Sequence, residues 1–259
     1  MRRAGSHSAA WDYLESISPD VALLQEVVAI PKRLQDTFSA TFKLAMGKKG
    51  KTQRFGSAVL VKSATIPEMS LPNVAQWSSS YVDHFDGNLI GCGLSGTPDL
   101  MILNCYFPAW PIAGPESLFG NLIPHVEEAL CEGYSKLYLT DVVWFVLREG
   151  AAQLPTSLIV AGDFNRSYTF EAKWNTTGSR QTLDRFKNLG MIEVLSETHS
   201  VVVPTFRHAR GKIEDQIDHF FVTEDLWRQV SNCQVGDMDK VFGRSLSDHL
   251  PIIVDIEFN

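Results

Sequence analysis

Three apolar segments of this chain each border a short group of acidic, amide or imidazole side chains, and this arrangement constrains the fold more than any other feature. The first segment is followed by Glu26 and the second by Asp163 and Asn165, while the third is preceded by Asp248 and His249. If the three segments are strands of one sheet, these side chains converge at one end of it. Carboxylates, an amide and an imidazole together suit a metal-assisted attack on a phosphate ester.

The composition is that of a globular protein with a substantial core, because 44% of the 259 residues are hydrophobic and 20% are charged. No linker, repeat or low-complexity tract divides the chain, so we expect one domain over residues 1–259. The net charge of −7 disfavours a generic polyanion binder, since long nucleic-acid footprints depend on Lys and Arg contacts to phosphates. The basic run at residues 47–54 is either a solvated loop, which we favour, or a phosphate-steering loop at the rim of a site.

Hydrophobic periodicity predicts the order of the elements. Helices are predicted over residues 10–17, from an N-cap at Thr140 to Leu147, over residues 183–189 with Gly190 at the end, and after Thr223. Strands are predicted at residues 21–24, 56–61, 89–94, 100–105, 158–161 and 217–222, near Cys233 and after Pro251. Residues 95–99 predict a hairpin with a longer loop. Because strands are joined both by hairpins and by helices, we expect an α/β (α+β) fold of two packed mixed sheets with helices outside.

Each polar group at a strand end has an ordinary interpretation and a functional one. A Glu such as Glu26 is commonly the first solvated residue after a strand, whereas a divalent cation needs a carboxylate held at a rigid strand end. The Gly-Asp-x-Asn sequence forms ordinary turns, yet Asp163 can orient or deprotonate a water molecule and the amide of Asn165 can donate to a phosphoryl oxygen. Tyr106 is either a core or rim aromatic residue, or a phenol that reaches a phosphate.

Asp218 lies within a strongly apolar predicted strand and needs a partner if it is buried. We expect that partner to be His249, held as an imidazolium by the carboxylate, although a His beside Asp248 is by itself more often a surface or capping residue. His219 is the lesser candidate, because strand alternation directs it to the opposite face from Asp218.

The cysteines indicate a reducing compartment. Cys92, Cys105, Cys131 and Cys233 form no CxxC pair, and buried thiols are the simplest interpretation. No apolar stretch follows the basic residues 1–3, so we expect no secretory signal. No run approaches the roughly 18 apolar residues of a membrane helix. We therefore expect a cytoplasmic monomer without a membrane span.

Taken in order, these motifs resemble the endonuclease/exonuclease/phosphatase superfamily, of the deoxyribonuclease I and exonuclease III type. The matching segments span nearly the whole chain and are residues 18–26, 104–108, 162–165, 217–220 and 247–251. The resemblance implies a four-layered α/β sandwich with two mixed sheets face to face, helices outside, and the site at the mouth between the sheets.

The resemblance also implies one or two Mg²⁺ ions, with Mn²⁺ as a substitute. By this likeness Glu26 is a metal ligand and Asp248 lies at or next to the metal. Asp163 would orient or activate the attacking water.

The phosphate contacts follow from the same likeness. Asn165 and His249 would bind phosphoryl oxygens, Asp218 would orient His249, and Tyr106 would touch the phosphate.

The sequence departs from the family at its start. Members usually begin with a strand that carries an Asn of the metal and phosphate site, and here the predicted helix at residues 10–17 comes almost first. We therefore consider three functions: a Mg²⁺-dependent phosphodiesterase, most of all a nuclease; a hydrolase of a small-molecule or lipid phosphoester; and a catalytically impaired binding protein with an open sheet edge.

Overall fold

The fold is taken from a computed structural model, which describes residues 4–48, 50–62, 64–112, 126–132, 135–174 and 178–258. The strands are β1 Val21–Val27, β2 Phe38–Met46, β3 Thr52–Lys62, β4 Leu89–Leu94, β5 Thr97–Tyr106, β6 Ser157–Asp163, β7 Ile192–Glu193, β8 Phe206–Arg207, β9 Ile213–Asp215, β10 Asp218–Val222, β11 Val230–Val235 and β12 Ile252–Ile256. The helices are α1 Ala10–Ile17, α2 Lys32–Gln35, α3 Gln76–His84, α5 Leu139–Glu149, α6 Phe170–Trp174, α7 Ser179–Asn188, α8 Val194–His199, α9 Glu224–Trp227 and α10 Met238–Val241.

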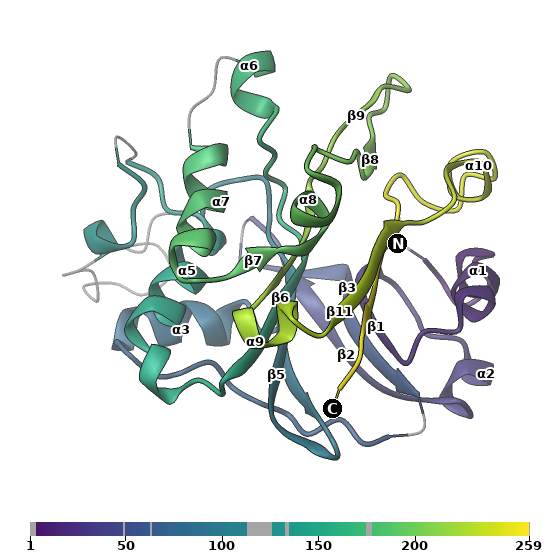
Figure 1. Cartoon of the computed structure of the whole chain (residues 1–259), viewed down its shortest axis with the longest axis horizontal. Coiled ribbons are helices and arrows are strands. Elements are labelled where there is room, and N and C mark those ends of the chain that lie inside the picture. Colours follow the sequence, from purple (N-terminus) through teal and green to yellow (C-terminus); the bar gives the residue numbers. More distant parts are fainter. Residues whose placement is uncertain are drawn as a thin grey trace.

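Two sheets dominate the architecture (Figure 1). The central sheet has five strands in the order β4-β5-β6-β10-β7, with β5 and β6 parallel and the other pairs antiparallel. The N-terminal sheet has the order β1-β3-β2 and is antiparallel. Strands β11 and β12 form a separate antiparallel pair, as do β8 and β9. The N-terminal sheet is built from three consecutive strands, whereas the central sheet joins strands from distant parts of the sequence.

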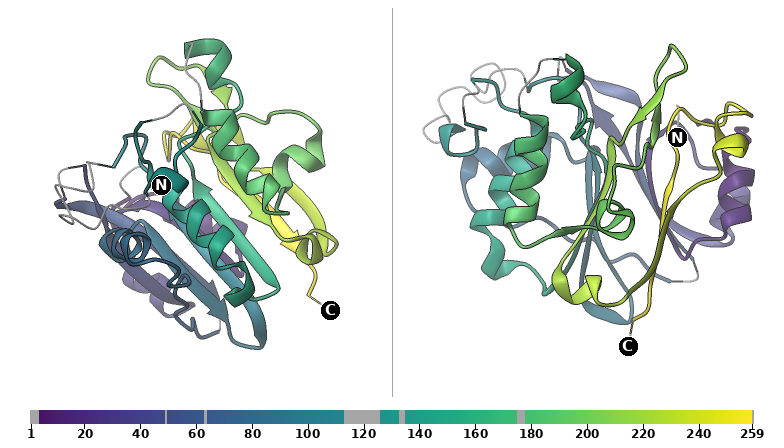
Figure 2. Two further views of the ribbon diagram at one scale, coloured as in Figure 1. Left: turned by 90° about the vertical axis from the view of Figure 1, so that its left-hand side faces the viewer. Right: turned by 45° about the horizontal axis from the view of Figure 1, so that its top comes forward.

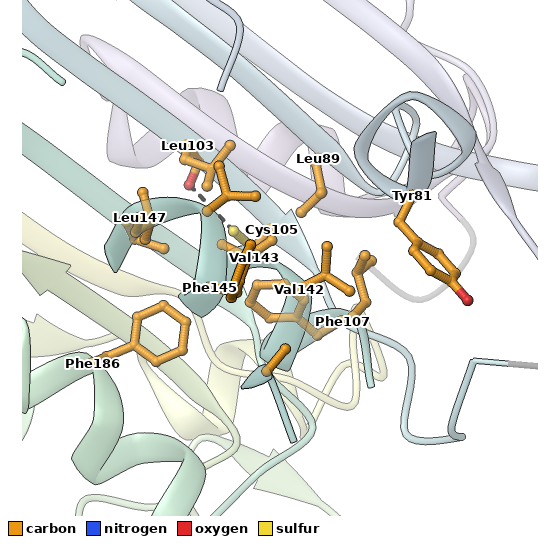
Figure 3. Close-up of a cluster of buried hydrophobic side chains, with 14 of the residues drawn as sticks. Tyr81, Leu89, Leu103, Cys105, Phe107, Val142, Val143, Phe145, Leu147 and Phe186 are labelled. Carbon is orange, nitrogen blue, oxygen red and sulfur yellow. Dashed lines mark hydrogen bonds between the residues drawn. The ribbon is translucent and has the colours of Figure 1, made fainter. Parts of the chain in front are cut away.

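Strand alternation divides the apolar side chains among three layers of core. Val59 and Val61 of β3 pack between the two sheets, whereas Ala58 and Leu60 pack under α1 and α2. The outer face of the central sheet packs against α3, α5 and α7, where Phe186 lies among the buried side chains (Figures 2 and 3). The order is therefore helices, sheet, sheet, helices, and the expected four-layered sandwich is confirmed.

Some local expectations were wrong. Helix α5 begins at Leu139, because the carboxylate of Asp141 accepts the N–H of Tyr138 at 2.9 Å and so caps the helix before Thr140. Strands β4 and β5 are joined by only two residues, Ser95 and Gly96, which makes the hairpin loop shorter than predicted. Strand β2 was missed because its side chains are mostly exposed or half-buried, as on an edge strand.

The three segments that carry the candidate site do not share one sheet. Strands β1, β6 and β12 belong to three different sheets. They converge because the sheets pack face to face, and not through pairing within one sheet.

A groove of about 700 Å³ separates β1 from β12. Its walls are Val21–Glu26 and Ile252–Ile256, and its floor includes Ile102 and Ile159 of the central sheet. Within the described residues, β12 pairs only with β11, and the side of β1 away from β3 carries only a single bridge between Ala4 and Val27. Both strands thus present an edge to the groove. Residues 1–3, and Lys49 of the basic run, lie outside the described residues.

Candidate active site

A row of three polar side chains crosses the central sheet at one end of the groove. Tyr106 ends β5, Asp163 ends β6 and Asp218 begins β10. Asp163 is the register partner of both Tyr106 and Asp218. Because all three share the strand face that carries Ile159 and Ala161, they point toward the N-terminal sheet. Parallel and antiparallel pairing therefore bring together residues from distant parts of the sequence.

Glu26 reaches this row from the opposite sheet. It lies at a bulge between Leu24 and Val27 and adopts a left-handed conformation with φ +57°. Its carboxylate Oε1 accepts the hydroxyl of Tyr106 at 3.4 Å. Left-handed backbone is uncommon for a Glu and concentrates at functional positions, since the surrounding structure must compensate for its cost.

Asn104 connects the two sheets behind Glu26, and sequence reasoning did not single it out. Its side chain is fully buried, and its amide donates to the carbonyl oxygens of Leu24 at 3.3 Å and Ala58 at 2.9 Å. Its Oδ1 accepts from the side chain of Gln25 at 2.6 Å. An amide inside the apolar segment of β5 was the only signal, because a buried amide needs partners on a neighbouring element.

The turn after β6 is held by Asn165, which has φ +49°. Its backbone N–H donates to Asp163 Oδ1 at 2.9 Å, and its side-chain amide donates to Asp163 Oδ2 and to the carbonyl of Phe107, each at 2.9 Å. Both hydrogens of the amide are thereby engaged, so a bond from Asn165 to a phosphoryl oxygen requires the loss of one of them. Gly162, at φ +138°, has no room for a side chain, because a Cβ would lie 2.0 Å from the carbonyl oxygen of Cys105.

The predicted pairing of Asp218 with His249 is present. Nδ1 of His249 lies 2.9 Å and 3.0 Å from the two carboxylate oxygens of Asp218. Burial alone would lower the pKa of His249, but the carboxylates of Asp218 and Asp163 raise it to about 9. His249 is therefore an imidazolium at neutral pH.

The pKa of Asp163 is also raised, which for a carboxyl group favours the neutral form. Burial raises its pKa to about 7, the charges of Asp218 and Glu26 add to the rise, and the His249 imidazolium opposes it. A carboxyl group with this pKa can exchange a proton near neutral pH, which is the property of a general base.

The groove collects four of the predicted side chains, since Glu26, Asp163, Asp218 and His249 all line it. Tyr106 and Asn165 join them through their bonds to Glu26 and Asp163. Asp248 does not line the groove; its backbone carbonyl accepts the N–H of Arg207 at 2.8 Å.

A family model described as the Endonuclease/Exonuclease/phosphatase family matches residues 2–249 of the chain. The chain belongs to this family. The expected phosphoester hydrolase class is thereby confirmed, and so is the resemblance seen in the sequence. No curated protein matches the sequence significantly.

Solved structures match the fold over nearly the whole chain. The 3′ phosphatase NExo from Neisseria, bound to a product DNA hairpin, is 18% identical with a TM-score of 0.67 and covers 96% of this chain and 93% of its own. An AP endonuclease from Archaeoglobus fulgidus is 17% identical with a TM-score of 0.62, covering 95% and 92%. The AP endonuclease LMAP from Leishmania major is 16% identical with a TM-score of 0.60, covering 97% and 82%. At these identities the likeness establishes the fold.

The carboxylates at this end of the groove fit a divalent cation that keeps several water ligands. The described residues contain no group of three or more His, Cys, Asp and Glu side chains arranged to enclose a metal. Mg²⁺ characteristically binds through one or two carboxylates and keeps its remaining positions for water and substrate phosphate. Beyond burial, the charges of Asp218 and Glu26 raise the pKa of Asp163, so this end of the groove carries negative charge that a cation would offset.

Two further sequence expectations concern compartment and membrane. All four cysteines are free and buried, as predicted. Among the described residues, no helix combines the length and the apolar character needed to cross a bilayer.

Proposed function

We propose that the protein is a Mg²⁺-dependent phosphodiesterase, and specifically a nuclease that cleaves by in-line attack of water. The observation that carries this proposal is geometric: Asp163 is the register partner of Asp218, whose carboxylate holds His249, so a buried carboxyl and an imidazole line the same groove next to each other. Such a pair supplies a proton acceptor for water and a charged donor for a phosphoryl oxygen in one site.

Asp163 takes the proton of the attacking water. Its two oxygens are fixed by the backbone and side-chain N–H groups of Asn165, which orient the carboxylate. We therefore assign Asn165 first to positioning Asp163, and only secondarily to the phosphate.

His249 binds an equatorial phosphoryl oxygen. Asp218 holds its Nδ1, so Nε2 carries the hydrogen that is directed at substrate. Tyr106 reaches the phosphate from the neighbouring strand. Because its single hydroxyl hydrogen is donated to Glu26, a bond to a phosphoryl oxygen requires that this hydrogen turn away from Glu26.

Glu26 is the proposed first ligand of Mg²⁺, with Asp248 as the adjacent carboxylate implied by the family resemblance. When bound, the metal neutralises charge that develops on the leaving oxygen.

The substrate class is supported by the structural neighbours, since the Neisseria protein was solved with a DNA hairpin and others are AP endonucleases. The 3′ phosphatase among them favours a second candidate, the hydrolysis of a terminal phosphomonoester. We further propose a cytoplasmic location, because all four thiols are free and buried, and a monomer, because one chain supplies every proposed group.

The test is a substrate panel with and without EDTA, comprising plasmid, abasic oligonucleotide, 3′-phosphorylated oligonucleotide, inositol phosphates and sphingomyelin. Mg²⁺-dependent cleavage of DNA substrates is expected. Preference for the 3′-phosphorylated oligonucleotide would select the phosphatase candidate. Turnover of only inositol phosphates or sphingomyelin would replace the nuclease proposal, and no turnover of any substrate would leave a binding protein.

A further inference from the structure

Three buried polar side chains lie behind the candidate site, on the face of the central sheet away from the groove. Glu193, Gln216 and His219 are 2%, 3% and 1% exposed. Charged and polar groups at such depth are costly unless they are bonded to one another. The role proposed for the site so far uses none of them.

The carboxylate of Glu193 is held in place by three hydrogen bonds. Its Oε2 accepts the N–H of Ser196 at 2.7 Å, and its Oε1 accepts the side chain of Gln216 at 3.1 Å and the N–H of Phe220 at 3.3 Å. Although burial disfavours the charge, these three donated hydrogen bonds stabilise the carboxylate form of Glu193. Glu193 is thus a carboxylate anchored to α8 and β10.

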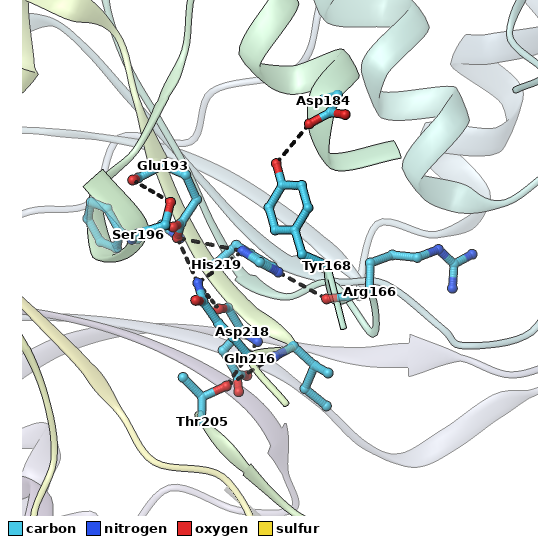
Figure 4. Close-up of polar contacts among 11 residues, drawn as sticks. Arg166, Tyr168, Asp184, Glu193, Ser196, Thr205, Gln216, Asp218 and His219 are labelled. Carbon is cyan, nitrogen blue, oxygen red and sulfur yellow. Dashed lines mark hydrogen bonds and ion pairs between the residues drawn. The ribbon is translucent and has the colours of Figure 1, made fainter. Parts of the chain in front are cut away.

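Gln216 and Glu193 together fix the imidazole of His219. Nδ1 of His219 lies 3.2 Å from the amide nitrogen of Gln216 and 3.6 Å from Glu193 Oε1 (Figure 4). On its other side, Nε2 lies 3.0 Å from the carbonyl oxygen of Arg166. Because a carbonyl oxygen can only accept, Nε2 is the donor in this bond.

The carbonyl that His219 holds belongs to the residue directly after Asn165. Asn165 has a left-handed backbone at φ +49° and carries the amide that orients Asp163. A left-handed non-glycine residue persists only where neighbouring bonds fix it. The His219 bond supplies such a constraint on the C-terminal side of the turn.

Strand alternation explains why one dipeptide serves both sides of the sheet. Asp218 points toward the groove and binds His249, whereas the ring of His219 packs beside Phe164 and Phe221 on the opposite face. The period of two along a strand predicts this opposite direction from the sequence alone.

We propose that Glu193, Gln216 and His219 are positioning residues that lock the Asp163–Arg166 turn from behind, with His219 as the residue that holds the backbone. The inference rests on the proposed function, because it concerns the turn that carries the proposed base. His219 touches no substrate; it acts through the Arg166 carbonyl on Asn165 and Asp163.

The decisive variant is His219→Phe, which keeps a buried ring and removes the donor. Because small misplacements of catalytic groups are costly, we expect kcat to fall on the order of 10- to 100-fold while KM changes by less than about threefold. His219→Gln, whose amide can donate near the same position, should restore most of the lost kcat. Glu193→Gln preserves volume and should lower kcat to an intermediate value, which provides a second measurement if His219→Phe folds poorly.

Phe186→Leu is the matched control. Phe186 is fully buried and packs against Phe164 and Phe221, the same two rings that flank His219, but its side chain binds no backbone. We expect this variant to lose thermal stability without loss of kcat. Equal loss of kcat in Phe186→Leu and His219→Phe would reduce His219 to a core residue and overturn the proposal.

Hydrogen exchange of the peptide that spans residues 163–170 provides a readout independent of activity. Exchange in this peptide should accelerate in His219→Phe and stay at the wild-type rate in Phe186→Leu. Unchanged exchange in His219→Phe would overturn the positioning role. If the wild-type protein hydrolyses no phosphoester, the proposed function fails, while this exchange comparison still decides whether His219 holds the turn.

Discussion

Replacing Asp218 by Asn should change the stability of the protein in a strongly pH-dependent way. The two carboxylate oxygens of Asp218 lie 2.9 Å and 3.0 Å from Nδ1 of His249. Against the effect of burial, this carboxylate is the main reason that the pKa of His249 rises to about 9. The Asn side chain has nearly the same shape but no charge, so the substitution removes the electrostatic part of the interaction.

The magnitude follows from the pKa of His249. A rise from 6.5 to about 9 corresponds to about 3 kcal/mol of interaction with the charged imidazole, at about 1.4 kcal/mol for each tenfold change in proton affinity. Because the pKa in the folded state lies above the unfolded value, this stabilisation is present in full below about pH 6.5 and is lost as the pH rises through about 9. Because Asp163 supplies part of this rise, Asp218→Asn should lose the larger share of the stabilisation and be on the order of 2 kcal/mol less stable than wild type at pH 6.

At high pH the difference should vanish or change sign. His249 is neutral there, and the charge of Asp218 then only repels Asp163, whose pKa it raises in addition to the effect of burial. Urea denaturation at pH 6, 8 and 10 without divalent cations measures the difference. Asp99→Asn, at an exposed position on β5, is the control and should show a small difference that does not vary with pH. A constant deficit for Asp218→Asn at all three pH values would refute the reasoning.

Three other substitutions or extensions test the site and the groove. Asp163→Asn should reduce hydrolysis on the order of 10²-fold or more with the fold intact, because it removes the proposed proton acceptor; near wild-type turnover of the purified variant would show that the role is wrong. Glu26→Gln should shift the dependence of activity on Mg²⁺ to higher concentration, because a neutral amide is a weaker ligand for a hard cation; an unchanged curve would exclude Glu26 as a ligand. A strand-forming segment added ahead of Met1 should raise both the melting temperature and the phosphodiesterase rate, by pairing with the edges of β1 and β12; a version with two prolines in the segment is the control, and equal melting of all forms would show that the groove takes no strand.

The sequence by itself determined most of the elements and the identity of the chemical groups. Continuous apolar runs predicted β3, β5, β6 and β10, since a strand buried on both faces needs apolar side chains on both. The polar groups that interrupt those segments were visible for the same reason: Asp218 in an apolar strand required a partner, and His249 is that partner. Buried polarity is a local signal, and it can be read without knowing the fold.

Only the tertiary structure decided how these groups meet. Glu26 and Asp163 come together across two sheets that pack face to face, and no periodicity within one strand encodes that packing. The use of both Asn165 amide hydrogens depends on the carbonyl of Phe107, a residue 58 positions away in the chain. His219 was set aside from the sequence because it points away from Asp218, and its bond to the Arg166 carbonyl exists only because the turn after β6 folds over the opposite face of β10. Side-chain type is local information, whereas the partner of a buried group is set by long-range pairing of strands and sheets.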